Sequence, residues 1–540
     1  MMNKIYPLIF LLFIYTTGKS QFVEKVTSIN YDGINGLNPT NITTFNGKLY
    51  FFGTDEKFYV DKLMLTADGS AAGVAVVKEI DTMKQYPTLK HLTVLNNLLI
   101  FNNDNQLWKS DGTTAGTALI TNIYSSAANF VVFNNKVYFG ANITNSYPLQ
   151  DQLWQTDGTA AGTTLVKTIN PTGPANISNL FTEGGKIYFS ANDGVHNSQL
   201  WISDGTASGT TLLKIINPTG IAFPSNFIAY NGKVYFSAFD DINGSQLWAT
   251  DGTTSGTLKI TNINAPGTGL SPSVFTLFNS KLFFSGIDTI TTAVFYQLWS
   301  TDGTTGGTVK VKTDYTPRNG VAGFYPSSMA VHKNLLYTAG YDSLTATIQL
   351  WACDGTKTGT SKITSFPLGL SPSRLYSFQN KLIMTGSDTI SGQEQLFASD
   401  GTAAGTVCPT PPDTWGQYPF YPWEAWVPFN NALYYKGAYS YFSDYQLCRY
   451  TEHPSGIKQQ SAGNLSVYPN PTSGCITLVL AGISDATGIE VYNSMGVLVH
   501  RQKAVNDVNI IDLSNHPMGV YILKVISNNQ SIASQKIIKE

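Results

Sequence analysis

The sequence predicts an all-β protein: a multi-bladed β-propeller of about nine four-stranded blades, followed by a small Ig-like β-sandwich. Three observations support this prediction. A twelve-residue phrase, clearest as QLWISDGTASGT at 199–210, occurs eight times at spacings of 43 to 52 residues. A hairpin sequence such as FNGKLYF at 45–51 occurs nine times, and both repeats end before about residue 452. Repeats of this length are typical of stacked units that bury their apolar faces against one another.

One repeat, residues 178–216, indicates how a unit folds. Four runs rich in β-branched and aromatic residues, SNLFTEG, GKIYFSAND, SQLWISD and TTLLKII, are separated by Gly-Gly and Asp-Gly turns, which predicts a four-stranded meander. Ile187 and Phe189 face one side of their strand, and Tyr188 faces the other. Because both sides carry apolar bulk, we expect each sheet to lie between two copies of itself, as in a propeller.

The two ends of the repeat array indicate how a ring would close. The ninth unit stops after its third strand, at YQLCRY (445–450), and the chain offers FVEKVTSIN (22–30), which is similar to the fourth strand TLVKTIN (164–170). We therefore expect the N-terminal strand to complete the last blade, which would remove an exposed sheet edge. An eight-bladed ring is an alternative because the boundary units are degenerate, and an open solenoid with capped ends is another.

Composition restricts the class of partner. The chain has 540 residues, of which 13% are charged, with 33 basic and 35 acidic side chains and no clustered basic run. This balance gives no electrostatic case for nucleic acid. The four cysteines are too few and too scattered for a disulfide framework.

Four segments are expected along the chain. Residues 1–20 have the basic start, short apolar run and small polar end of a signal peptide, and the run is too short to span a bilayer, so no transmembrane segment is expected. The propeller is expected over 21–451, a polar linker over 452–463 and a separate β domain over 464–540.

Each Asp-Gly turn is expected to join the third and fourth strands of a blade. Asp can accept a hydrogen bond from the backbone two residues on, Gly can take a left-handed conformation, and the Thr hydroxyls can bond the loop backbone. We interpret the turns as structural. Calcium at each turn is the alternative, although one carboxylate per turn is sparse for that ion, and no other cofactor is expected. The repeated aspartates are Asp68, Asp111, Asp157, Asp204, Asp251, Asp302, Asp354 and Asp400.

Six of the nine tryptophans share one position of the repeat, and Leu65 and Phe397 stand there in the outlying units. Exchange between Trp, Leu and Phe favours a packing role between sheets over an exposed stack for ligands. These tryptophans are Trp108, Trp154, Trp201, Trp248, Trp299 and Trp351.

Binding is expected on the face that carries the loops between second and third strands and the links between blades. These segments vary from unit to unit, for example at 141–152, 238–246 and 286–297, and variable loops on a rigid scaffold commonly determine specificity. The segment 411–426 holds the other three tryptophans and suggests an aromatic platform for sugar rings or a polypeptide. The alternative is that it packs the seam or the channel of the ring. The candidate platform is Trp415, Tyr418, Tyr421, Trp423 and Trp426.

The sequence therefore predicts a non-enzymatic binding or adhesion protein that recognises glycan or protein. No catalytic residue is assigned, since the six histidines are dispersed and neither a phosphate-binding Gly-Lys loop nor a Gly-x-Ser-x-Gly elbow is present. A secreted polysaccharide hydrolase or lyase is the alternative, and Asp413 and Glu424 within the aromatic segment are the acids that would suit it. A structural surface-layer component is the third hypothesis.

The QLWxSDGTxxGT motif resembles the Trp-Ser-Asp-Gly-Thr repeat of surface and secreted proteins from Bacteroidetes-type bacteria. Four Asp-Ser/Thr-apolar tripeptides likewise resemble O-glycosylation sites of such bacteria. The residues that this resemblance marks as candidates are Thr82, Thr289, Ser343 and Thr389.

The C-terminal segment is similar to the C-terminal sorting domain of the type IX secretion system. The similarity lies in VYPNP at 467–471, VYN at 491–493, GVY at 519–521 and the basic KIIK at 536–539. It implies that the secretion machinery is a partner, that the chain crosses an outer membrane, and that the tail is removed, with release or attachment at the cell surface.

Overall fold

The structure is a computed structural model. It describes residues 22–27, 36–55, 60–81, 89–103, 105–125, 130–142, 150–264, 266–290, 293–313, 317–318, 321–387, 394–409, 421–422, 426–438, 445–452, 465–480, 488–493, 497–504, 508–527 and 530–540. The expected signal peptide lies outside these residues, and so does the expected linker apart from Glu452. The chain divides into two compact units: Ser20–Glu452, and His453–Glu540 together with Met1–Lys19.

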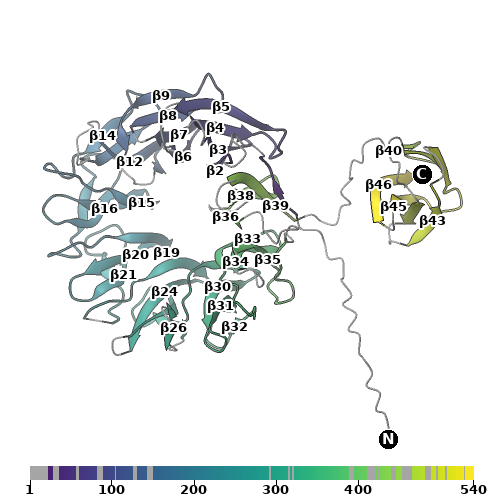
Figure 1. Cartoon of the computed structure of the whole chain (residues 1–540). Helices are drawn as coiled ribbons and strands as arrows, with labels where there is room; N and C mark the ends of the chain where they lie inside the picture. Colours follow the sequence, from purple (N-terminus) through teal and green to yellow (C-terminus); the bar gives the residue numbers. More distant parts are fainter. Residues whose placement is uncertain are drawn as a thin grey trace, which may run out of the picture. The chain divides into compact units, whose positions relative to one another are not determined.

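The described part of the first unit forms ten antiparallel sheets, and nine of them, which we call blades 1 to 9, are arranged around a common axis (Figure 1). In most blades the first strand lies nearest the axis and later strands follow outward. Blades 1 to 5 consist of β2 (Thr40–Phe45), β3 (Lys48–Asp55), β4 (Val60–Thr66) and β5 (Val74–Asp81); β6 (Lys90–Leu95), β7 (Leu98–Asn103), β8 (Gln106–Ser110) and β9 (Ala118–Asn122); β10 (Tyr124–Ser125), β11 (Val131–Phe133), β12 (Lys136–Asn142), β13 (Gln152–Thr156) and β14 (Thr164–Lys167); β15 (Ser178–Glu183), β16 (Lys186–Asn192), β17 (Ser198–Ser203) and β18 (Thr211–Lys214); and β19 (Ser225–Tyr230), β20 (Lys233–Asp240), β21 (Gly244–Thr250) and β22 (Leu258–Lys259).

The remaining blades are less regular. A short hairpin, β27 (Pro317–Arg318) and β28 (Val321–Ala322), precedes blade 7, and blade 8 gains its outer pairing from the isolated bridge between Ala398 and Val407. Blades 6 to 9 consist of β23 (Ser273–Phe278), β24 (Lys281–Ile290), β25 (Ala293–Thr301) and β26 (Val309–Lys312); β29 (Met329–His332), β30 (Leu335–Asp342), β31 (Thr347–Cys353) and β32 (Thr360–Lys362); β33 (Ser373–Phe378), β34 (Lys381–Ser387) and β35 (Glu394–Ser399); and β36 (Tyr421–Pro422), β37 (Val427–Phe429), β38 (Ala432–Ala438) and β39 (Tyr445–Thr451) with β1 (Phe22–Lys25).

Both faces of a blade are buried, as the alternation in the sequence predicted. In blade 4, Ile187 and Phe189 pack with Leu153 of blade 3, whereas Tyr188 packs with Phe236 of blade 5. The described residues contain nine such apolar cores, one for each neighbouring pair of blades, including the pair formed by blades 9 and 1. The prediction of a propeller is therefore confirmed, with nine blades.

The ring closes through the N-terminal strand. β1 pairs antiparallel with β39, from Phe22 opposite Thr451 to Lys25 opposite Cys448, so the first strand of the chain is the outer strand of the last blade. Beyond β1, the buried Thr27 hydroxyl donates to Gln446 Oε1 at 2.6 Å. The expected completion of the last blade by the N-terminal strand is thus confirmed.

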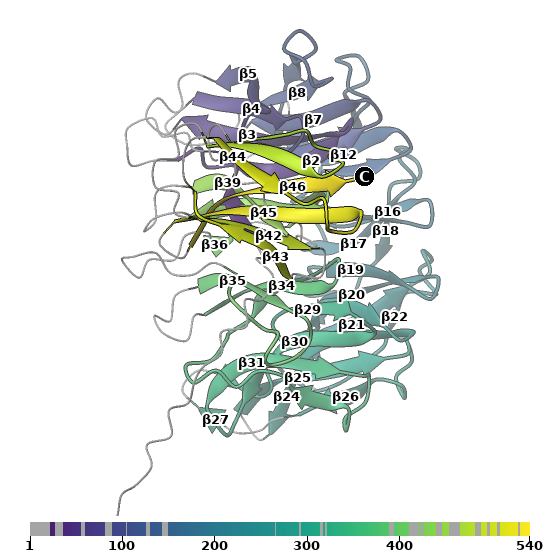
Figure 2. The same ribbon diagram turned by 90° about the vertical axis from the view of Figure 1, so that its right-hand side faces the viewer.

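Short turns and irregular loops lie on opposite faces of the ring. Because each blade is an antiparallel meander, the turns between strands 1 and 2 and those between strands 3 and 4 share one face, which we call the turn face. The loops between strands 2 and 3 and the links between blades share the other, which we call the loop face. Figure 2 shows the unit from the side, with β22 and β26 toward the right and β27 toward the left.

The second unit is a small sandwich of two sheets around one core. Its core includes Ile476 and Leu478 from one sheet and Val491 and Leu523 from the other. No helix of the described residues is long and apolar enough to cross a membrane. The strands are β40 (Leu465–Tyr468), β41 (Cys475–Leu480) and β44 (Val508–Asp512) in one sheet, and β43 (Leu498–Gln502), β42 (Gly488–Asn493), β45 (Gly519–Ser527) and β46 (Gln530–Lys539) in the other.

Thr27→Val tests the closure of the ring. The Thr27 hydroxyl also accepts the N–H of Leu447 at 3.0 Å, so valine removes two buried hydrogen bonds that join residues far apart in the sequence. We expect a loss of about 1 to 3 kcal/mol in the free energy of unfolding. Tryptophan fluorescence during urea unfolding is a suitable readout, because all nine tryptophans precede residue 453. Thr44→Val, at an exposed position of β2, is the control, and equal stability of the two variants contradicts the seam.

Candidate functional site

The Asp-Gly turns of the turn face are built alike from hydrogen bonds within each turn. In blade 4, Asp204 Oδ1 accepts the N–H and the hydroxyl of Thr206 at 2.9 and 2.7 Å. The Thr206 hydroxyl oxygen accepts the N–H of Gly209 at 2.9 Å, and Ser203 and Thr210 bond each other at 2.7 Å. The bond from the backbone two residues on, which the sequence predicted, recurs at all eight aspartates.

Both glycines of the turn are required by geometry. Gly205 has φ of +90°, and a Cβ at Gly209 would overlap the Asp204 carboxylate. A Cβ at Gly205 would also meet the hydroxyl of Tyr138, which reaches across from blade 3 and donates to the Gly205 carbonyl at 3.4 Å. Equivalent tyrosines of other blades approach the turn of the next blade. In blade 9, the Tyr434 hydroxyl donates to the Gly69 carbonyl of blade 1 at 3.0 Å. The recurrent Tyr of the hairpin sequence was the signal for this contact between blades.

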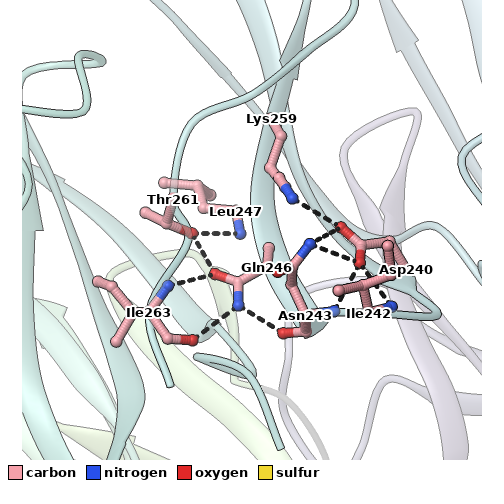
Figure 3. A network of polar contacts seen from close by, with 8 residues as sticks. All are labelled: Asp240, Ile242, Asn243, Gln246, Leu247, Lys259, Thr261 and Ile263. Atoms are coloured by element: carbon pink, nitrogen blue, oxygen red, sulfur yellow. Dashed lines mark hydrogen bonds and ion pairs between the residues drawn. The ribbon is translucent and has the colours of Figure 1, made fainter. Parts of the chain in front are cut away.

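On the loop face, a buried glutamine of the QLW motif fastens the link to the next blade. Figure 3 shows the network in blade 5. Gln246 Nε2 donates to the carbonyls of Asn243 and Ile263 at 2.7 and 2.8 Å, and its Oε1 accepts from Ile263 and Thr261. Gln199 holds the link after blade 4 in the same way, through Ile216 and Asn217. The glutamine recurs in the sequence beside Leu and Trp. Its role could not be predicted, because its hydrogen-bond partners lie in a link 17 residues away and the sequence does not show that this link passes beside the glutamine.

An aspartate at the end of the second strand orders the loop that follows. Asp240 accepts from the backbone of Ile242 and Asn243 and pairs with Lys259 Nζ at 2.9 Å (Figure 3). Burial alone would raise the pKa of Asp240, but the hydrogen bonds from Asn243 and Lys259 outweigh it and lower the pKa. Three further carboxylates at this position are paired similarly: Asp342 with Lys362, Asp288 with Lys310, and Asp193 with His196.

These anchors position an exposed apolar patch on the loop face, formed by Ile221, Phe223, Phe239 and Ile242. Their exposed fractions are 57, 53, 42 and 70%. The two segments that carry them run side by side, because the N–H of Phe239 donates to the carbonyl of Ala222 at 2.8 Å. Four large apolar side chains gathered at one exposed place are typical of a binding surface.

Phe223 is held in a left-handed conformation with φ of 45°, which is uncommon for an aromatic residue. In several other blades the residue at this position of the link also has positive φ, and it is Asn38, Asn176, Ser271, Tyr325 or Ser371. The scaffold therefore fixes this backbone, and blade 5 presents a phenylalanine on it. Phe223 was not among the residues predicted from the sequence, although its place just before the recurrent proline of the links was a signal that could have found it.

The structure places only part of the predicted aromatic platform. Trp426 is buried between blades 8 and 9, where its Nε1 donates to the Arg374 carbonyl at 2.6 Å and its ring lies edge-on to Tyr435. It therefore packs the ring, which was the alternative considered for this segment. Tyr421 is described only as backbone in β36, and Trp415, Tyr418 and Trp423 lie outside the described residues, so their role stays a prediction.

The repeat tryptophans lie in or beside the cores between blades. Trp201, Trp248, Trp299 and Trp351 are buried, and Phe397 fills the same position in blade 8. Trp108, Trp154 and Leu65 are half-buried and pack against these cores. This location agrees with a packing role.

Two of the four candidate O-glycosylation residues fall within the described part of the chain. The half-buried Thr289 lies in β24 and its hydroxyl donates to Asn264 Oδ1 at 3.0 Å, whereas Ser343 lies in the loop between β30 and β31. Thr82 and Thr389 lie outside the described residues. Modification at all four stays a prediction.

The turn aspartates do not gather into metal sites in the region that the structure describes. No group of three or more His, Cys, Asp and Glu side chains there is arranged to hold a metal ion. Each turn offers one carboxylate, and its Oδ1 already accepts hydrogen bonds from the same turn. The structural interpretation of the turns and the calcium alternative both stay predictions.

The C-terminal tail matches a known protein family. Residues 466–540 match the family described as the secretion system C-terminal sorting domain. The tail is a type IX secretion sorting domain, and the protein is exported to the cell surface or the extracellular space. The chain is also 32% identical over 83 residues to Ulvan lyase NLR42 of Nonlabens ulvanivorans, and this match covers 15% of each protein.

Comparison with solved structures gives matches of low sequence identity and low TM-score. A puromycin hydrolase is 11% identical with a TM-score of 0.32, over 67% of this chain and 58% of its own. Sqt1 of Saccharomyces cerevisiae is 7% identical with a TM-score of 0.34, over 72% and 95%. The GH74 xyloglucanase of Xanthomonas campestris is 10% identical with a TM-score of 0.32, over 73% and 65%.

Two neighbouring glycines of blade 6 provide a matched test of the turn. A Cβ at Gly307 would overlap the Asp302 carboxylate, whereas a Cβ at Gly306 would meet nothing within 4 Å. We expect Gly307→Ala to lower the free energy of unfolding by about 1 to 3 kcal/mol. Gly306→Ala should leave it unchanged or raise it by about 0.5 kcal/mol, since alanine restricts the unfolded chain. Equal effects of the two substitutions, measured by urea unfolding, would contradict this turn geometry.

Stability should fall in acid because of the turn aspartates. Hydrogen bonds from Thr304 lower the pKa of Asp302, and the pKa values of the other seven turn aspartates are lowered in the same manner. A carboxyl with a lowered folded-state pKa stabilises the fold above its unfolded pKa of about 3.9, and this contribution is lost as the pH falls through the folded value. The urea midpoint should therefore fall below about pH 5. Asp302→Asn removes one charge, so its difference from the wild type should be largest at pH 7 and shrink toward pH 3; a constant difference would be the contrary result.

Proposed function

We propose that this exported protein is a non-enzymatic binding or adhesion propeller that needs no cofactor and recognises glycan or protein through its loop face. The observation that carries the proposal is the exposed apolar patch of Ile221, Phe223, Phe239 and Ile242. It lies on segments that differ between blades, and buried networks around Gln199, Asp240 and Gln246 hold those segments in place. A rigid scaffold with an exposed anchor cluster loses little entropy on binding.

The engagement of four acids on the described part of the loop face supports binding over catalysis. Asp193, Asp240, Asp288 and Asp342 each pair with a cationic or imidazole group. Three of them, Asp193, Asp240 and Asp342, also accept hydrogen bonds from the loops that follow them. A general acid or nucleophile for glycoside cleavage needs a carboxyl directed at the substrate. We also propose that the repeat is of the same kind as the Trp-Ser-Asp-Gly-Thr repeat of surface and secreted proteins from Bacteroidetes-type bacteria.

The test pairs binding with turnover. The full chain is applied to a glycan array and to immobilised extracellular-matrix proteins, and a panel of soluble polysaccharides is assayed for new reducing ends. We expect binding to at least one ligand without new reducing ends. Appearance of reducing ends favours the hydrolase or lyase hypothesis, and self-assembly into sheets without any ligand favours the surface-layer hypothesis.

Substitution of the patch localises the binding. Phe223→Ser with Ile242→Ser should weaken binding at least tenfold, because two exposed anchors are lost. Leu258→Ser with Val309→Ser is the matched control, since these residues are 52 and 46% exposed on outer strands. Equal affinities of the two double variants would place the binding site elsewhere.

A further inference from the structure

The turn face carries lysines close to the axis. The turn between strands 1 and 2, or the residue just after it, contributes a lysine in blade 1 and in every blade from 3 to 8. None of these side chains is buried, and those of Lys48, Lys233, Lys281 and Lys333 are exposed. We call this set the lysine ring; it consists of Lys48, Lys136, Lys186, Lys233, Lys281, Lys333 and Lys381.

The acidic groups of the same face lie farther out. The eight turn aspartates stand between strands 3 and 4, whereas the lysines stand between strands 1 and 2, nearer the axis. Glu183, beside Lys186 in blade 4, is the acidic side chain that the described hairpin tips add to the inner zone. The lysines thus stand on the axial side of the turn aspartates and next to them: Lys333 Nζ donates to the Asp400 carbonyl at 3.2 Å, and Lys233 and Lys281 attract the carboxylates of Asp251 and Asp302. A narrow anionic chain at the centre meets the lysines, while a broad anionic surface also meets the aspartates and is repelled by them.

A hollow lies within the lysine ring, between the hairpin tips of blades 5 and 6. Its volume is about 370 Å³, and Tyr230, Asn231, Gly232, Leu277, Ser280 and Lys281 line it. The Tyr230 hydroxyl donates to the Ser280 carbonyl at 2.7 Å, which fixes one tip against the other. Leu277 is 45% exposed and offers an apolar wall, while Asn231, Ser280 and Lys281 offer polar and cationic groups.

We propose that the turn face binds an anionic polysaccharide, with the hollow between blades 5 and 6 as a subsite for one charged sugar. A sugar ring presents apolar C–H groups to Leu277 and hydroxyls to Asn231 and Ser280. Its carboxylate or sulfate meets Lys281, and the neighbouring charges of the chain meet the other lysines of the ring. This site is on the opposite face from the apolar patch, so it stands or falls independently of the proposed function.

The first test measures binding of the full-length protein to polygalacturonate, dextran sulfate and uncharged dextran at low and high salt. We expect binding to one or both anionic polymers, weakening as salt is raised, and none to dextran. The anionic polymer that binds more tightly distinguishes carboxylate from sulfate as the preferred group. Equal binding of dextran, or equally tight binding of poly-L-glutamate, would overturn the assignment to an anionic polysaccharide.

Charge variants locate the site. Lys233→Gln with Lys281→Gln should weaken binding of the preferred polymer about fivefold, as expected for two exposed ion pairs. Lys90→Gln with Lys109→Gln removes the same charge from the opposite end of a first strand and from a third strand, and should change the affinity less than twofold. Equal weakening by both pairs would show that net charge alone, and not the lysine ring, governs binding.

The hollow is tested separately. Leu277→Gln should weaken binding severalfold by removing the apolar wall, while Val309→Gln, on the outer strand of blade 6 and 46% exposed, should not. Circular dichroism confirms that both variants are folded. An unchanged affinity of Leu277→Gln would overturn the assignment of the hollow as a subsite.

Discussion

Packing of each sheet between two neighbours is the constraint on which the first unit depends. A blade such as β15–β18 has apolar side chains on both faces, and neither face can be buried within one repeat. Nine cores between blades satisfy every face only because blade 9 also packs on blade 1. Tyr434 and Arg449 of blade 9 add polar contacts to the Gly69 carbonyl across the same seam, and Arg449 pairs with Glu24 of β1. Apolar packing and polar contacts therefore both hold the ring closed.

The closed ring separates two kinds of surface. On the turn face, repeated residues make repeated turns, so lysines stand on the axial side of the turn aspartates and one hollow lies between two hairpin tips. On the loop face, the buried Gln246 and Asp240 networks hold segments whose exposed side chains differ, which places Phe223 and Ile242 at one exposed patch. One repeated backbone therefore carries a turn face that is similar in every blade and a loop face that differs between blades. The sorting domain brings both to the outside of the cell.

Much of this architecture could be predicted from the sequence. Alternation of Ile187, Tyr188 and Phe189 indicated burial on both faces, and the missing strand at the end of the array indicated closure by β1, because both are local patterns. The apolar patch could not be predicted, since it joins two segments through a bond between Phe239 and Ala222. The lysine ring was also missed, because a single lysine in a hairpin is ordinary and only the common axis brings seven together.

The central claim, that the blades close into a ring through the N-terminal strand, is tested most directly by hydrogen exchange of the full-length protein. Mass spectrometry can follow the amides of residues 22–27 together with those of β39. Closure predicts that the β1 amides bonded to β39 exchange many times more slowly than in an unstructured peptide and gain protection with β39 as one unit. Exchange of residues 22–27 at the rate of an unstructured peptide, while β39 stays protected, would contradict the closed ring.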